Sequence, residues 1–135
     1  MSTDERTDLT PVLSALAGSG VRLSAPAEPV WLPAAVAGEI RAAVRAALDN
    51  VTRHAGPGAE VFMLVDNEAD EVVVSVRDTG RGIAAGRLLE AERAGRMGLA
   101  QSIRARIEGV GGTVTLTSGE GEGTEVELHV PRRSS

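Results

Sequence analysis

Residues 100–131 read AQSIRARIEGVGGTVTLTSGEGEGTEVELHVP and contain both periodicities from which an α/β fold is built. Apolar residues recur at helical spacing in the first part, which predicts a helix over residues 98–109 that ends at a pair of glycines. Residues 113–118 and 124–130 then alternate between apolar and polar side chains on either side of a glycine-rich turn. The stretch therefore predicts a helix followed by a β-hairpin.

The middle of the chain repeats this combination of a helix and a hairpin. Pro33 precedes the strongest helical pattern, which predicts a helix over residues 34–55. Residues 60–66 and 71–77 are two apolar runs separated by a short polar turn, and they predict a second hairpin. Because each helix has only one apolar face, we expect a two-layer α/β (α+β) sandwich whose helices cover one face of a mixed, mostly antiparallel sheet. The helical residues expected to face that sheet include Ile40, Val44 and Ile103.

The first third of the chain gives weaker signals. Residues 1–8 are polar and acidic, which predicts a disordered leader. Thr10 followed by Pro11 predicts a helix start with Thr10 as the N-cap. Alternation over residues 21–24 and a brief apolar run over residues 30–32 predict two short strands before the long helix.

Length and composition exclude several classes of protein. The 135 residues fit one domain, which we place at residues 20–131, with a leader or linker over residues 1–19 and a tail over residues 132–135. Nineteen acidic against fourteen basic residues give a net charge of −5, which disfavours nucleic acid as the partner. Without cysteine, the chain has no disulfides, thiolate zinc sites or cysteine nucleophiles. Apolar runs are too short to cross a bilayer and no signal peptide is apparent, so we expect a cytoplasmic domain without direct membrane contact.

The long helix ends in the first polar motif, RAALDNVTRHA over residues 45–55. Asn50 shares one helical face with Ala46, Arg53 and His54, and we expect this face to look away from the core. An amide oxygen beside cationic side chains suits a hydrated Mg²⁺ bound to a polyphosphate. The alternative interpretation is a solvated helix face without a ligand.

Two glycine-containing motifs follow. DTGRGI over residues 78–83 comes directly after a strand, and its aspartate could accept a hydrogen bond from an exocyclic amine such as that of adenine. GRMGLA over residues 95–100 opens a helix, where free backbone N–H groups bind phosphate. Taken singly, the first motif is also compatible with a plain turn and the second with an ordinary junction between a loop and a helix.

In their order and spacing, these motifs resemble the ATP-binding catalytic domain of sensor histidine kinases. That domain has the Bergerat (GHKL) fold, which is shared with gyrase-type, Hsp90-type and MutL-type ATPases. The resemblance covers residues 20–131, and the last helix and hairpin look particularly like those of histidine kinases from high-GC Gram-positive bacteria. It implies binding of ATP and Mg²⁺, and partnership with a dimerisation domain that carries the phosphoacceptor histidine and with a response regulator.

The resemblance also implies roles for single residues. Asn50 matches the metal ligand, Asp78 matches the acceptor from the adenine amino group, and Thr124 matches the threonine that supports adenine recognition. Residues 84–97 match a short ATP lid. The positions implied for nucleotide binding are Asn50, Arg53, His54, Asp78, Gly80, Gly82, Ile83, Arg96, Met97, Gly98, Leu99 and Thr124.

The sequence departs from the family pattern at Ala46. Many of these kinases have a glutamate there, four residues before the asparagine, which acts as a general base or polarises the nucleophile. Glu39 lies eleven residues before Asn50, too far along the helix to substitute directly. No catalytic residue is therefore assigned, and we expect ATP binding with negligible hydrolysis by the domain alone.

Three functions fit this pattern. The first is the catalytic domain of a two-component sensor histidine kinase, which presents Mg·ATP to a histidine on another domain. The second is a stand-alone anti-sigma serine kinase of the same fold. The absence of a dimerisation helix from the sequence favours this alternative. The third is a nucleotide-binding pseudokinase, which the alanine at position 46 favours.

Overall fold

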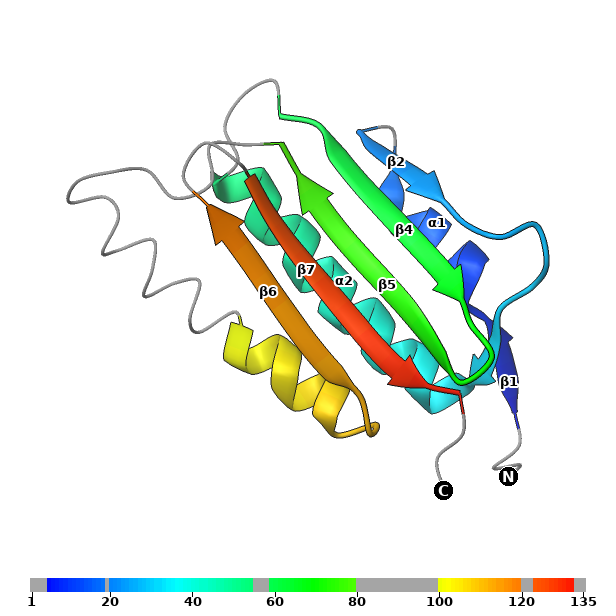
Figure 1. The fold of residues 1–135 in the computed structure, drawn as a ribbon. Helices are drawn as coiled ribbons and strands as arrows, with labels where there is room; N and C mark the ends of the chain where they lie inside the picture. Colours follow the sequence, from blue (N-terminus) through cyan, green and yellow to red (C-terminus); the bar gives the residue numbers. More distant parts are fainter. Residues whose placement is uncertain (1–4, 19, 55–58, 80–99, 120–122, 133–135) are drawn as a thin grey trace.

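The computed structural model describes residues 5–18, 20–54, 59–79, 100–119 and 123–132. Its main feature is a five-stranded sheet with the helices on one face (Figure 1). In chain order, the elements are β1 (Arg6–Asp8), α1 (Leu9–Ala17), β2 (Val21–Ser24), β3 (Trp31–Pro33), α2 (Ala34–His54), β4 (Val61–Asn67), β5 (Glu71–Asp78), a helix over residues 100–108, β6 (Thr113–Gly119) and β7 (Gly123–Pro131).

The sheet is mixed and mostly antiparallel, with the strand order β2-β4-β5-β7-β6. β2 pairs with β4 in parallel, and the other three pairings are antiparallel. β4 with β5 and β6 with β7 form the two predicted hairpins, and the pairing of β5 with β7 joins them. The predicted two-layer α/β sandwich is confirmed.

The core lies between the sheet and the helices. Ile40 and Val44 of α2 are 0% and 1% exposed, and Ile103 of the last helix is 1% exposed, so the predicted apolar stripes face the sheet. Met63 and Leu128 bury their side chains from the sheet side, as do the alternate valines of β5. Burial of this kind stabilises a fold by roughly 25 cal/mol for each Å² of apolar surface removed from water.

Two expectations for the N-terminal part are wrong. Arg6–Asp8 do not lie in a disordered leader but form β1, which pairs with β3 as a separate two-stranded sheet. The N-cap of α1 is Asp8 rather than Thr10, because the Asp8 carboxylate accepts hydrogen bonds from the backbone N–H of Thr10 and of Val30. The same carboxylate thus caps a helix and holds the chain ahead of β3. Leu9 and Leu13 of α1 are fully buried in the common core, although they fall within the expected leader over residues 1–19.

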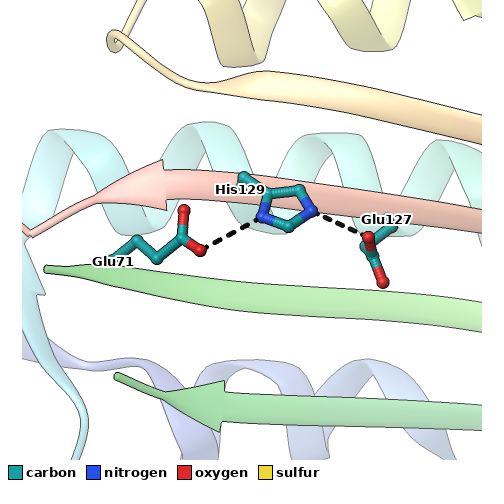
Figure 2. Close-up of polar contacts among 3 residues, drawn as sticks. All are labelled: Glu71, Glu127 and His129. Atoms are coloured by element: carbon teal, nitrogen blue, oxygen red, sulfur yellow. Dashed lines mark hydrogen bonds and ion pairs between the residues drawn. The ribbon is translucent and has the colours of Figure 1, made fainter. Parts of the chain in front are cut away.

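The described helices do not cover the other face of the sheet (Figure 1). By the strand register, the side chains on this face are mostly polar. His129 lies there between two carboxylates, with Nδ1 3.3 Å from Glu71 Oε2 and Nε2 2.7 Å from Glu127 Oε1 (Figure 2). The hydrogen bond with Glu127, and that with Glu71, raise the pKa of His129 against the opposing effect of partial burial. This cluster is therefore a charge-assisted contact between β5 and β7.

Candidate functional site

The candidate site begins with a buried polar pair where β5 ends and β7 starts. Asp78 stands directly opposite Thr124 in the pairing of these strands, and the two residues are only 5% and 8% exposed. Both follow the alternation of the core valines, so they lie on the face of the sheet that the helices cover. A carboxylate at this position can accept a hydrogen bond from a ligand.

Two local features fix the backbone around Asp78. Thr79 donates its N–H to the carbonyl oxygen of Glu60 at 2.9 Å, and its Oγ1 accepts from the N–H of Glu60 at 2.8 Å. Gly123 has φ +79°, and a Cβ built there would lie 2.0 Å from the carbonyl oxygen of Asp78. Only glycine therefore allows β7 to approach β5 this closely.

Asn50 lies near the C-terminal end of α2, and this end meets the end of β5 and the start of β7 on one side of the molecule (Figure 1). Its side chain is partly buried. Ala46, one turn earlier, is partly buried and packs against the core, so the expectation that this helical face looks away from the core is wrong at Ala46. A methyl group thus stands where a catalytic carboxylate would stand in the family pattern.

Glu39 is engaged elsewhere on α2. Its Oε1 accepts from Nη1 of Arg106 at 3.2 Å, which links α2 to the helix over residues 100–108. Eleven residues at 1.5 Å of rise separate Glu39 from Asn50 by about 16 Å along the helix axis. Glu39 therefore does not take the place of the missing carboxylate, and its ion pair instead helps set the spacing of the two helices.

Several predicted site residues lie outside the described part of the chain. These are Gly80, Gly82, Ile83, Arg96, Met97, Gly98 and Leu99, together with the predicted lid over residues 84–97. The backbones of Arg53 and His54 belong to α2, but their side chains also fall outside the description. Of the predicted nucleotide-binding set, the structure thus places Asn50, Asp78 and Thr124, and it puts all three at the same end of the fold.

The described residues contain no cluster of three or more His, Asp or Glu side chains that could hold a metal ion. A Mg²⁺ ion bound mainly through the phosphates of a nucleotide needs only one or two protein ligands. The chemistry of the amide at Asn50 fits such an ion. No helix among the described residues is both long and apolar enough to span a bilayer.

The described structure thus has a helix-covered mixed sheet with a buried carboxylate and an opposing hydroxyl at one end. The chain belongs to the family of histidine kinase-, DNA gyrase B- and HSP90-like ATPases, whose family model matches residues 35–134. This membership confirms the resemblance drawn from the motifs and identifies the chain as an ATP-binding domain. No curated protein sequence matches the chain significantly.

Solved structures similar to this chain include domains of histidine kinases. The ATP-binding domain of PrrB from Mycobacterium tuberculosis is 21% identical with a TM-score of 0.70, and the match covers 98% of this chain and 100% of that one. The catalytic domain of the histidine kinase ThkA is 15% identical with a TM-score of 0.76, and the match covers 97% and 98%. The histidine kinase domain of a blue-light activated kinase from Erythrobacter litoralis is 23% identical with a TM-score of 0.61. That match covers 92% of this chain, which spans only 57% of the Erythrobacter domain.

Two features of the structure were absent from the predicted site, one beside Asp78 and the other further along α2. Gly123 belongs to the Gly-x-Gly-Thr sequence over residues 121–124, and the glycines of this motif could have indicated a close backbone approach. That the approach is to the carbonyl oxygen of Asp78 depends on the pairing of the strands. The ion pair of Glu39 with Arg106 joins residues 67 positions apart, and no local pattern in the sequence indicates it.

Proposed function

We propose that the chain is the ATP-binding catalytic domain of a two-component sensor histidine kinase, and that it presents Mg·ATP for phosphoryl transfer to a histidine on a separate dimerisation domain. The observation that carries the proposal is the buried Asp78 opposite Thr124 at the end of the central strands, in a chain of this ATPase family. The likeness of the fold to catalytic domains of histidine kinases supports the choice of kinase over the other ATPases of the family.

In this proposal Asp78 selects the base. An ionised carboxylate only accepts hydrogen bonds, so it pairs with the exocyclic amine of adenine and not with the carbonyl of guanine. Thr124 supports this recognition from β7, and Gly80, Gly82 and Ile83 shape the pocket beside the adenine. Burial of Asp78 strengthens the selection, because a hydrogen bond to the base is stronger where water is excluded.

The C-terminal end of α2 would hold the phosphates. Asn50 would supply an amide oxygen to the metal, and Arg53 and His54 would contribute positive charge to the phosphates. Arg96 to Leu99, which precede the described part of the last helix in the sequence, would contribute backbone N–H groups. When bound, ATP supplies the phosphoryl group and Mg²⁺ neutralises the charge that develops on it, so the protein contributes mainly positioning.

Ala46 favours a second candidate, a nucleotide-binding pseudokinase. Alanine has neither a lone pair nor a charge with which to orient or deprotonate a nucleophile, and general-base assistance typically contributes a factor of 10²–10⁴ in rate. In the kinase proposal, an acidic residue next to the phosphoacceptor histidine supplies this function from the partner domain. A response regulator then receives the phosphoryl group, and the reaction takes place in the cytoplasm.

A phosphotransfer assay separates the two candidates. The polypeptide that carries this domain together with the dimerisation domain is incubated with Mg²⁺ and γ-labelled ATP. The kinase proposal predicts a label that is stable in base, labile in acid and lost when the phosphoacceptor histidine is replaced. Tight binding of ATP without such a label would establish the pseudokinase instead.

A further inference from the structure

A pocket lies at the end of the sheet opposite to Asp78. Its described lining consists of Arg6, Trp31, Ala69, Asp70 and Arg132, and its volume is about 550 Å³. We call it the distal pocket. β5 begins beside it at Glu71 and rises about 3.4 Å per residue, so Asp78 is about 24 Å away. The distal pocket is therefore separate from the nucleotide site.

The strand pairing explains why these residues meet. Arg6 stands opposite Pro33 and Trp31 stands opposite Asp8, so Arg6 and Trp31 are diagonal neighbours on one face of the small sheet. On the other side, the backbone N–H of Arg132 donates to the carbonyl oxygen of Asp70 at 3.0 Å, which holds the chain after β7 against the turn between β4 and β5. Four separate segments thus converge on the pocket.

The pocket has an excess of positive charge. Its described lining has two guanidinium groups and one carboxylate. Within the residues that the structure describes, no carboxylate lies within ion-pair distance of the Arg6 guanidinium. The Arg132 guanidinium donates to Oδ1 of Asn67, a neutral amide that leaves its charge uncompensated. An anion is therefore the complementary ligand.

Trp31 adds an apolar contact surface. It is the only tryptophan of the chain, and 48% of it is exposed although its strand neighbour Leu32 is fully buried. Pockets for small molecules are mostly apolar and enclosed, whereas the distal pocket has a single aromatic ring among charged side chains. Arginine and tryptophan together are typical of the residues that dominate protein–protein interfaces.

From this arrangement we infer that the distal pocket binds an acidic segment of a partner protein. A carboxylate of that segment pairs with the guanidinium groups of Arg6 and Arg132, and a neighbouring apolar side chain packs on the indole of Trp31. The inference does not depend on the proposed kinase activity, because it concerns the opposite end of the molecule.

The fluorescence of Trp31 provides a direct test, because no other tryptophan and no tyrosine contributes to the emission. The intact chain is titrated at low salt with the peptide acetyl-EELEELEE-amide and with its neutral counterpart acetyl-QQLQQLQQ-amide. We expect a saturable change in emission with the acidic peptide, and affinity for the neutral peptide lower by about tenfold or more. R6Q and R132Q should each weaken binding of the acidic peptide several-fold.

The matched control is R22Q, which removes an equal charge from an exposed arginine on β2 that pairs with Glu60. R22Q should leave peptide affinity unchanged, and thermal melts should show that all three variants remain folded. Equal affinity for both peptides, no saturable change, or equal weakening by R22Q and R6Q would overturn the inference. Binding of citrate or inorganic phosphate as tight as that of the peptide would also overturn it, in favour of a site for free anions. ATP affinity, measured on the same samples, tests the proposed function independently.

Discussion

Asp78 and Thr124 face each other across the β5–β7 pairing, both buried, at the point where the two central strands of the sheet meet. Neighbouring Gly123 makes this geometry possible, since any Cβ there would collide with the carbonyl oxygen of Asp78. A carboxylate and a hydroxyl are thus held side by side by backbone constraints rather than by flexible loops. Sites on rigid elements keep their geometry better than sites on loops, which suits discrimination between similar bases.

Gly123→Ala should disrupt this end of the sheet. The new Cβ would lie 2.0 Å from the Asp78 carbonyl oxygen at a φ of +79°, so β7 would have to shift away from β5. We expect the free energy of unfolding to fall by about 2 kcal/mol or more, with loss of ATP binding. Urea denaturation measures the first effect and calorimetry the second.

Gly38→Ala is the matched control for this substitution. Gly38 lies in α2, and nothing lies within 4 Å of a Cβ built there. Alanine is favoured over glycine in a helix by roughly 0.5–1 kcal/mol, so this variant should be slightly more stable than the parent. Similar losses of stability in both variants would contradict the close approach at Gly123.

Asn50→Ala should weaken binding of Mg·ATP more than binding of metal-free ADP. The amide oxygen would be lost as a metal ligand, while the contacts to the base at Asp78 would remain. Calorimetric titrations with Mg·ATP, and with ADP in the presence of a chelator, measure the two affinities. Equal weakening of both would show that Asn50 is structural.

Ala46→Glu should raise the rate of ATP turnover while leaving nucleotide affinity within a few-fold. The unmodified domain should bind ATP with negligible hydrolysis, because it lacks a carboxylate one turn before Asn50. Phosphate release measures the rate, and Ala42→Glu, one turn further from Asn50, is the control. Since Ala46 packs against the core, a thermal melt must show that the variant folds. Rapid hydrolysis of ATP by the unmodified domain would contradict the expected lack of a general base. The ion pair of Glu39 with Arg106 disfavours Glu39 as that base.

The His129 cluster on the open face should make stability depend on pH (Figure 2). Because Glu127 and Glu71 raise the pKa of His129 in the folded state, the protonated ring stabilises the fold fully below its ordinary pKa of about 6.5. This stabilisation is lost as the pH rises through the raised folded-state pKa. Its size should stay below about 1 kcal/mol, since the side chains of His129 and Glu127 are 30% and 37% exposed.

His129→Gln tests this dependence. The difference in free energy of unfolding between the unmodified chain and the variant should be larger at pH 5.5 than at pH 8.5, as measured by urea denaturation. Glu127→Gln removes the dominant hydrogen-bonded carboxylate and should reduce the effect of pH. The same difference at both pH values would exclude the ion-paired histidine as a source of stability.

Much of the fold follows from periodicity in the sequence. The stripe on α2, the apolar run in β5 and the alternation in β7 each depend on residues close together in the chain, and the structure confirms them. The N-terminal elements were harder to predict. β1 has only three residues and exists because it pairs with β3, some 25 positions later, and the side chain of Asp8 bonds to Val30 as well as to Thr10. The polar sequence of Arg6–Asp8 indicates neither the strand pairing nor the hydrogen bonds of Asp8.

The site likewise combines features that follow from the local sequence with features that depend on contacts between distant residues. The placement of Asp78, Thr124 and Asn50 at one end of the fold follows from short motifs at predictable places in an element, whereas their roles in binding stay predictions. The packing of Ala46 against the core, the pairing of Glu39 with Arg106 and the convergence of Arg6, Trp31 and Arg132 depend on how distant elements approach one another. Such contacts follow from the tertiary fold, which no local pattern encodes.

Asp78→Ala tests most specifically whether the Asp78 carboxylate selects adenine. Removal of the carboxylate should abolish measurable binding of ATP. Asp66→Ala is the control, because Asp66 is exposed near the far end of β4. It should leave the affinity unchanged, and equal losses in both variants would point to an effect on folding rather than on the site.

The most direct measurement needs no variant. It is a calorimetric comparison of ATP and GTP binding to the unmodified chain in the presence of Mg²⁺. We expect ATP to bind at least about tenfold more tightly than GTP, because guanine presents a carbonyl where Asp78 requires a donor. Equal affinities for the two nucleotides, or no binding of ATP, would contradict it.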